Sequence, residues 1–156
     1  MQNIIVSEFS TEYKLKAVKN ESFELNKIVN NHNQSELILR SLYDDSIMIY
    51  ESFFVLFLDN SLRVKGFLKI SQGGLTQTSV DVRMIFNAAL NCLATGLIIS
   101  HNHPSGKLEP SQADIRITQK IKEGCEILDI NLIDHIIITE FDSYSFLENK
   151  IYKPCK

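Results

Sequence analysis

The stretch that decides this fold is SHNHPSGKLEPSQAD, residues 100–114. The residues just before its first histidine, 96–100, are apolar or small and predict a short buried strand. Pro104 and Gly106 predict a sharp turn, and Ser111 marks the expected start of a helix. The stretch therefore predicts a strand, a turn and a returning helix that gather its polar side chains in one place.

Two histidines, a serine and an aspartate in this stretch have the spacing H-x-H-x7-S-x2-D, at His101, His103, Ser111 and Asp114. Alternate side chains of an extended segment point the same way, so both imidazoles can reach one ion while Asn102 points away. Asp114, in the first helical turn, can add a carboxylate. Three protein ligands that leave a fourth tetrahedral position for water are typical of a catalytic zinc site. We therefore predict a zinc ion held by the two histidines and the aspartate.

The pair Ser111 and Asp114 has a second interpretation. A serine followed three residues later by an acidic residue at a helix start resembles a capping box, in which both side chains satisfy backbone N–H groups. Taken alone, the pair is more typical of a cap than of a site. The order of a buried strand, two histidines, a turn and a first-turn aspartate favours the metal site.

A hydrolytic metal site also needs a group that accepts a proton from water and passes it to the leaving amine. Glu51 is the best candidate, because it precedes the apolar run 53–58, a rigid strand that can hold it in a cleft at the sheet edge. Glu109, Asp81 and Asp134 remain alternatives. The hydroxyl of Ser111 is a candidate hydrogen-bond donor to the oxyanion of a tetrahedral intermediate.

Asp134 and His135 interrupt the apolar run 132–138. A polar pair inside a buried strand needs hydrogen-bond partners. Two interpretations stay open: the pair supports the metal ligands from behind, or it makes structural hydrogen bonds.

Composition indicates a soluble globular protein. The 156 residues fit one domain with a real core, and no apolar run approaches the roughly 20 residues that cross a bilayer. The N-terminus lacks the pattern of a secretory signal. The three cysteines, Cys92, Cys125 and Cys155, are too far apart for a zinc ribbon and odd in number, which argues against a disulfide framework. We expect a cytoplasmic protein without a membrane partner.

The formal net charge is −3. Binding to nucleic acid draws much of its free energy from Lys and Arg that neutralise phosphates. A mildly acidic chain is therefore not expected to bind nucleic acid strongly.

Hydrophobic periodicity predicts the other elements. A helix is expected over residues 35–43, with Ser35 as its cap and Leu37, Ile38 and Leu42 on one side. The remaining predictions are a hairpin of strands at 53–58 and 62–70, a loop at 71–74, a helix at 80–93 with Val82, Ile85, Phe86, Ala89 and Leu93 inward, the helix at 111–128 with Ile115, Ile121, Cys125 and Leu128 inward, and strands at 130–139 and 144–147. This order indicates a sheet layered with helices, an α/β or α+β domain.

The N-terminal part is less informative. Residues 4–6 and 13–18 could form two short strands, and residues 30–33 are a polar break. We therefore divide the chain into an N-terminal extension, 1–34, which a short hairpin would fit, and a domain over 35–156.

With these residues in place, the chain resembles the JAMM (MPN+, JAB-domain) metalloprotease family, whose pattern is an upstream Glu followed by H-x-H-x7-S-x2-D. Within that family it is most similar to RadC-like proteins, through ESFF from Glu51, HNHPSG from His101, PSQADI from Pro110 and DHIII from Asp134. Longer RadC proteins carry a helix-hairpin-helix segment, and residues 1–34 hold no Gly-rich hairpin of that type. The chain looks like the short form.

The resemblance implies a cytidine-deaminase-like α/β fold, a three-layer arrangement with a mixed sheet between helices. It implies zinc on His101, His103 and Asp114, Glu51 as general acid and base, and Ser111 as oxyanion stabiliser. The expected function is a zinc metallopeptidase that cleaves a peptide or isopeptide bond in a peptide or protein substrate. The alternatives are a DNA-repair-associated accessory module whose metal site is unused and a noncatalytic scaffold domain.

Overall fold

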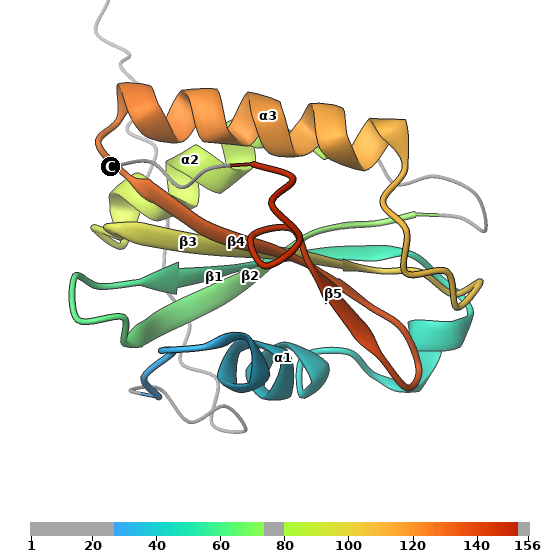
Figure 1. Cartoon of the computed structure of the whole chain (residues 1–156). Coiled ribbons are helices and arrows are strands. Elements are labelled where there is room, and N and C mark those ends of the chain that lie inside the picture. The colour runs from blue at the N-terminus through green and yellow to red at the C-terminus, as the bar shows by residue number, and fades with distance from the viewer. Residues whose placement is uncertain (1–26, 74–79, 153–156) are drawn as a thin grey trace, which may run out of the picture.

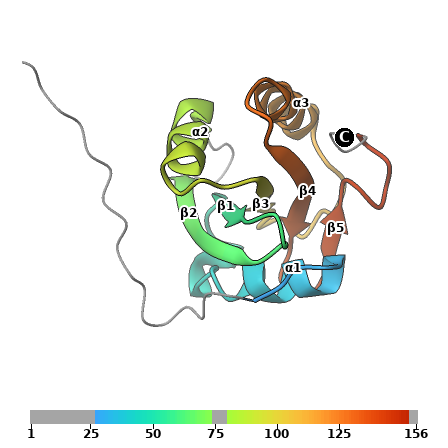
Figure 2. The same cartoon turned by 90° about the vertical axis from the view of Figure 1, so that its left-hand side faces the viewer.

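The computed structural model describes residues 27–73 and 80–152. These residues form three layers (Figures 1 and 2). Helix α1 (His32–Arg40) covers one face of a central sheet, and helices α2 (Val82–Asn91) and α3 (Gln112–Ile127) cover the other. A short 3-10 helix, η1 (Asp45–Met48), leads into the first strand.

The sheet has five strands in the order β2-β1-β3-β4-β5. Strands β3 and β4 are parallel and the other neighbouring pairs are antiparallel. The predicted class, an α/β fold with a mixed sheet between helices, is confirmed. The strand bounds are β1 Ser52–Leu58, β2 Val64–Gln72, β3 Gly96–Asn102, β4 Asn131–Ile138 and β5 Ser143–Ser145.

The central strands are buried on both faces, which explains why β1 and β3 read as continuous apolar runs rather than alternating ones. Val55 and Leu97 face the cluster under α2 and α3. Leu56 and Ile98 face the cluster over α1. The core is therefore divided by the sheet, and the metal-site stretch leaves the sheet on the side of α3.

The predicted hairpin is confirmed as β1 and β2, but β2 is longer than expected. Ser71 and Gln72, assigned to a loop from the sequence, pair with Phe53 and Ser52 of β1. Their polar character reflects an edge strand whose outer residues are half-exposed, not a break in the strand.

The prediction for α1 is wrong in its start, in its end at residue 43 and in the placement of Leu37, whereas Ile38 and Leu42 pack against the core as expected. Asn31, not Ser35, is the N-cap, and its side chain accepts a hydrogen bond from the backbone N–H of Gln34 at 3.0 Å. The polar run at residues 30–33, which was predicted to be a break, therefore contains the N-cap of α1. Ile38 and Leu39 face the core, whereas Leu37 is 70% exposed.

Helix α3 follows the prediction closely, with Ser111 as N-cap and Leu128 as C-cap. Ile121 and Cys125 are fully buried as expected, whereas Leu128, also expected inward, is exposed. At the end of α2, Leu93 was expected inward but is 77% exposed, because the helix has ended and the chain turns there with a φ of 52°.

Residues 1–26, with both strands predicted there, lie outside the described residues, so the division at residue 34 stays a prediction. Val29 is described, and it is buried in the cluster over α1. Its backbone N–H donates to Leu62 at 2.9 Å. Among the described residues no helix has the length and apolar character needed to cross a membrane.

Candidate metal centre

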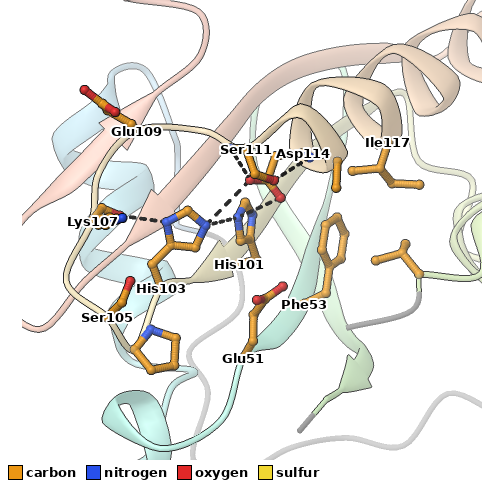
Figure 3. A pocket seen from close by; sticks show the side chains of 13 residues that line it. Glu51, Phe53, His101, His103, Ser105, Lys107, Glu109, Ser111, Asp114 and Ile117 are labelled. Atoms are coloured by element: carbon orange, nitrogen blue, oxygen red, sulfur yellow. Dashed lines mark hydrogen bonds and ion pairs between the residues drawn. The ribbon is translucent and has the colours of Figure 1, made fainter. Parts of the chain in front are cut away.

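The candidate metal centre lies where β3 ends and α3 begins (Figure 3). His101 is still within β3, paired with Phe53 of β1 and Ile137 of β4. His103 follows the strand, and its backbone N–H donates to Ile138 at 2.9 Å. Gly106 adopts a φ of 76°, a conformation that favours glycine, and turns the chain toward α3.

Three side chains converge at this point. Nε2 of His101 lies 2.9 Å from Nε2 of His103 and 3.2 Å from Oδ1 of Asp114. Oδ2 of Asp114 lies 3.6 Å from Nε2 of His103. Ligand atoms about 2.0–2.2 Å from a tetrahedral zinc ion lie about 3.3–3.6 Å from one another. The group therefore fits a small divalent cation after shifts of a few tenths of an ångström.

His103 is held by its other nitrogen. Nδ1 lies 2.7 Å from the backbone oxygen of Lys107, so Nδ1 donates and Nε2 of the neutral ring carries the lone pair. Burial disfavours the imidazolium, but the hydrogen bonds to Asp114 and Lys107 outweigh burial and raise the pKa of His103.

Asp114 is at the same time a helix cap and a member of this group. Its Oδ2 accepts from the backbone N–H of Ser111 at 2.6 Å, and its own backbone N–H donates to the Ser111 hydroxyl at 3.2 Å. The capping box is therefore present, and the two interpretations of this pair do not exclude each other. Burial works against ionisation, but the adjacent imidazoles of His101 and His103 stabilise the carboxylate when they are protonated and lower the pKa of Asp114 far below its ordinary value.

His135 lies behind the ring of His101, on the side away from the point where the three side chains converge. Its Nε2 is 2.8 Å from Nδ1 of His101, and its Nδ1 is 2.6 Å from the hydroxyl of Thr118. Complete burial keeps the pKa of His135 well below its ordinary value, so the ring is neutral. Asp134 instead accepts hydrogen bonds from Ser145 at the end of β5 and from Leu147 in the turn that follows. Of the predicted pair, only His135 contacts a ligand of the proposed metal site.

Glu51 and Ser111 line the same cavity as the three converging side chains. The cavity has a volume of about 480 Å³, and Figure 3 shows the carboxylate of Glu51, the residue just before β1, directed toward His101. Glu109 also lines the cavity, but its carboxylate points away from the histidines. Asp81 caps α2 instead. The geometry thus favours Glu51 among the carboxylates considered.

Asn102 is a residue that sequence reasoning passed over. Its Nδ2 donates to the backbone oxygens of Ile47 at 2.6 Å and Tyr50 at 2.8 Å. Its Oδ1 accepts from the backbone N–H of Ser52 at 2.7 Å. These bonds flank Glu51 on both sides and fix the segment that presents it. The sequence signal for this role was the predicted direction of the Asn102 side chain, away from the two histidines.

The cavity has two chemically different ends (Figure 3). Phe53 and Ile117 lie to one side of the converging side chains, and Val80 and Ala113 complete the apolar lining. The cavity continues on the other side along Ser105, Lys107 and Glu109.

Residues 28–151 match the family described as the RadC-like JAB domain. The chain belongs to this family. The match covers all the described elements of the sheet and the three helices, so the resemblance noted from the sequence is confirmed.

Curated relatives agree with this assignment. A UPF0758 protein of Flavobacterium johnsoniae is 53% identical over 103 residues, which are 66% of this chain and 45% of that protein. A UPF0758 protein of Shewanella denitrificans is 37% identical over 134 residues, 85% of this chain and 58% of that protein. The chain thus spans about half the length of the curated relatives it matches.

Proposed function

We propose that this RadC-like JAB domain is a zinc-dependent hydrolase that cleaves a peptide or isopeptide bond. The observation that carries the proposal is the convergence of His101, His103 and Asp114 in a cavity that Glu51 also lines. Family membership supports it, because the JAB family includes metalloproteases. The two-imidazole, one-carboxylate ligand set supports zinc as the metal.

The roles of the side chains follow from their positions. His101, His103 and Asp114 would hold the ion, which when bound supplies Lewis-acid polarisation of a carbonyl and lowers the pKa of water to about 7. Glu51 accepts the proton of the attacking water and returns it to the leaving amine. The Ser111 hydroxyl accepts from Asp114 and has its own hydrogen to donate to a developing oxyanion.

The substrate follows from the shape of the cavity. A chain laid across the converging side chains would meet an apolar wall at Phe53 and Ile117 and a polar end at Lys107 and Glu109. We propose a peptide or protein with an apolar side chain on one side of the cleaved bond and a polar one on the other.

The experiment that tests the proposal is a peptide-library cleavage screen on the zinc-loaded chain, followed by the variant Glu51→Gln. We expect the variant to bind zinc like the parent and to lose at least about 100-fold in kcat, the lower range for a general acid–base. Asp81→Asn is the matched control, since it removes a carboxylate that does not line the cavity, keeps a side chain that can cap α2, and should keep most of the activity. Equal turnover by Glu51→Gln and the parent would contradict the mechanism.

A further inference from the structure

A row of hydrogen bonds runs from the backbone of α3 through the interior to His101. The Thr118 hydroxyl oxygen lies 2.6 Å from the backbone oxygen of Asp114 and 2.6 Å from Nδ1 of His135. Nε2 of His135 lies 2.8 Å from Nδ1 of His101. All three side chains are buried, so their polar atoms depend on one another for hydrogen bonds.

The hydrogen positions along the row follow from its first contact. The backbone oxygen of Asp114 can only accept, so two oxygens at 2.6 Å require the Thr118 hydrogen between them. A hydroxyl has one hydrogen, so Thr118 accepts at its other contact and Nδ1 of His135 donates. The neutral imidazole of His135 has one N–H. Its Nε2 therefore carries a lone pair and accepts from Nδ1 of His101.

We infer that Thr118 and His135 are positioning residues that hold His101 in the tautomer with its hydrogen on Nδ1, which leaves the Nε2 lone pair directed at the cation site. The inference rests on the proposed function, because it assigns both residues to the same metal centre. Nε2 of His103 also carries a lone pair, since Nδ1 donates to Lys107. Two lone pairs and the Asp114 carboxylate then face one point, which favours a cation there.

The alternative is the same row of contacts with every donor and acceptor exchanged. Thr118 would donate to His135, His135 to His101, and Nε2 of His101 to His103. Both directions hold the same number of protons and differ only in tautomer. The opposite direction leaves the Thr118 and Asp114 oxygens 2.6 Å apart without a hydrogen between them, and it places an N–H on the atom that must face the cation. The inferred direction leaves Nε2 of His101 and Nε2 of His103 2.9 Å apart without a hydrogen between them, a contact that a cation bound to both lone pairs would relieve.

The first test removes the Thr118 hydroxyl while keeping the side-chain shape. In Thr118→Val, His135 loses its acceptor and can donate to His101 through Nε2. We expect zinc affinity, measured by competition with a chromophoric chelator, to fall about 10–100-fold. Thr118→Ser keeps the hydroxyl and should stay within about threefold of the parent. Thr139→Val is the matched control, because the buried Thr139 hydroxyl bonds to Asp142 in another turn.

The second test reads the tautomer itself. We expect ¹⁵N NMR of the metal-free chain to show the His101 hydrogen on Nδ1 in the parent and on Nε2 in Thr118→Val. His135→Gln should keep the hydrogen of His101 on Nδ1, since an amide can accept from His101 and donate to Thr118. This variant provides the measurement if Thr118→Val does not fold.

Two results overturn the inference: a His101 hydrogen on Nε2 in the metal-free parent, or zinc affinity in Thr118→Val equal to that of Thr118→Ser. A parent that binds no zinc contradicts the proposed function, whereas the tautomer of His101 in the metal-free chain still decides this inference.

Discussion

Asp114 takes part in the candidate metal centre, in the cap of α3 and in the buried row of hydrogen bonds. Its carboxylate meets both histidines, the same carboxylate caps its own helix, and its backbone oxygen accepts from Thr118. The convergence of these three side chains could be predicted from the sequence because the residue types lie close together at a specific spacing. Thr118 and Asn102 could not, because a lone threonine in a helix or asparagine beside a histidine gains its role only through tertiary contacts.

Asn102 yields a prediction at this scale. Asn102→Ala leaves the buried backbone N–H of Ser52 and the oxygens of Ile47 and Tyr50 without their side-chain partner. Each such loss costs about 1–3 kcal/mol, so we expect urea unfolding to show a loss of at least about 2 kcal/mol. Cleavage should fall while zinc stays bound, since the ligands are unchanged.

Asn91→Ala is the control for Asn102→Ala. Asn91 is exposed on α2, and its amide bonds within its own helix. Its loss should change the free energy of unfolding by no more than about 0.5 kcal/mol. Comparable losses in the two variants would mean that Asn102 does not anchor the Glu51 segment.

Among the elements, the sheet and α3 could be predicted because strong apolar runs and a capping pair define them. Helix α1 could not be placed correctly, because Asn31 looks like part of a loop until the helix is seen to begin beside it. Strand β4 shows the same limit. The pairing of β4 with β3 shifts register between Leu97 and Ile98, and this shift sets the face of the sheet on which Asp134 and His135 lie. No local sequence pattern predicts the shift.

Asp134 supplies a prediction for the β4–β5 unit. Burial raises the pKa of its carboxyl above the ordinary 3.8, although hydrogen bonds from Ser145 and Leu147 oppose the rise. The folded state therefore holds this proton more tightly than the unfolded state. As pH falls from the raised pKa toward 3.8, the free energy of unfolding of the parent should rise relative to that of Asp134→Asn.

Urea unfolding of both proteins at several pH values measures this difference. Asp142→Asn, which removes an exposed charge from the turn between β4 and β5, controls for the change in net charge. A difference between parent and Asp134→Asn that is constant with pH, or that moves in the opposite direction, would refute the assignment.

At the scale of the whole molecule, the sheet holds the three converging side chains beside a cavity, and the net charge of −3 gives no overall attraction to polyanions. We therefore expect the 156-residue chain not to bind duplex DNA measurably near about 100 mM salt. Fluorescence anisotropy over a range of salt concentrations checks this. Tight binding that weakens steeply with salt would instead favour the accessory-module alternative.

The measurement that tests the central claim most directly is anomalous diffraction at the zinc edge from crystals of the zinc-loaded chain. The account predicts one peak about 2.0–2.2 Å from Nε2 of His101, Nε2 of His103 and a carboxylate oxygen of Asp114. A peak bound by other side chains, or density without zinc between these three residues in zinc-soaked crystals, would contradict it.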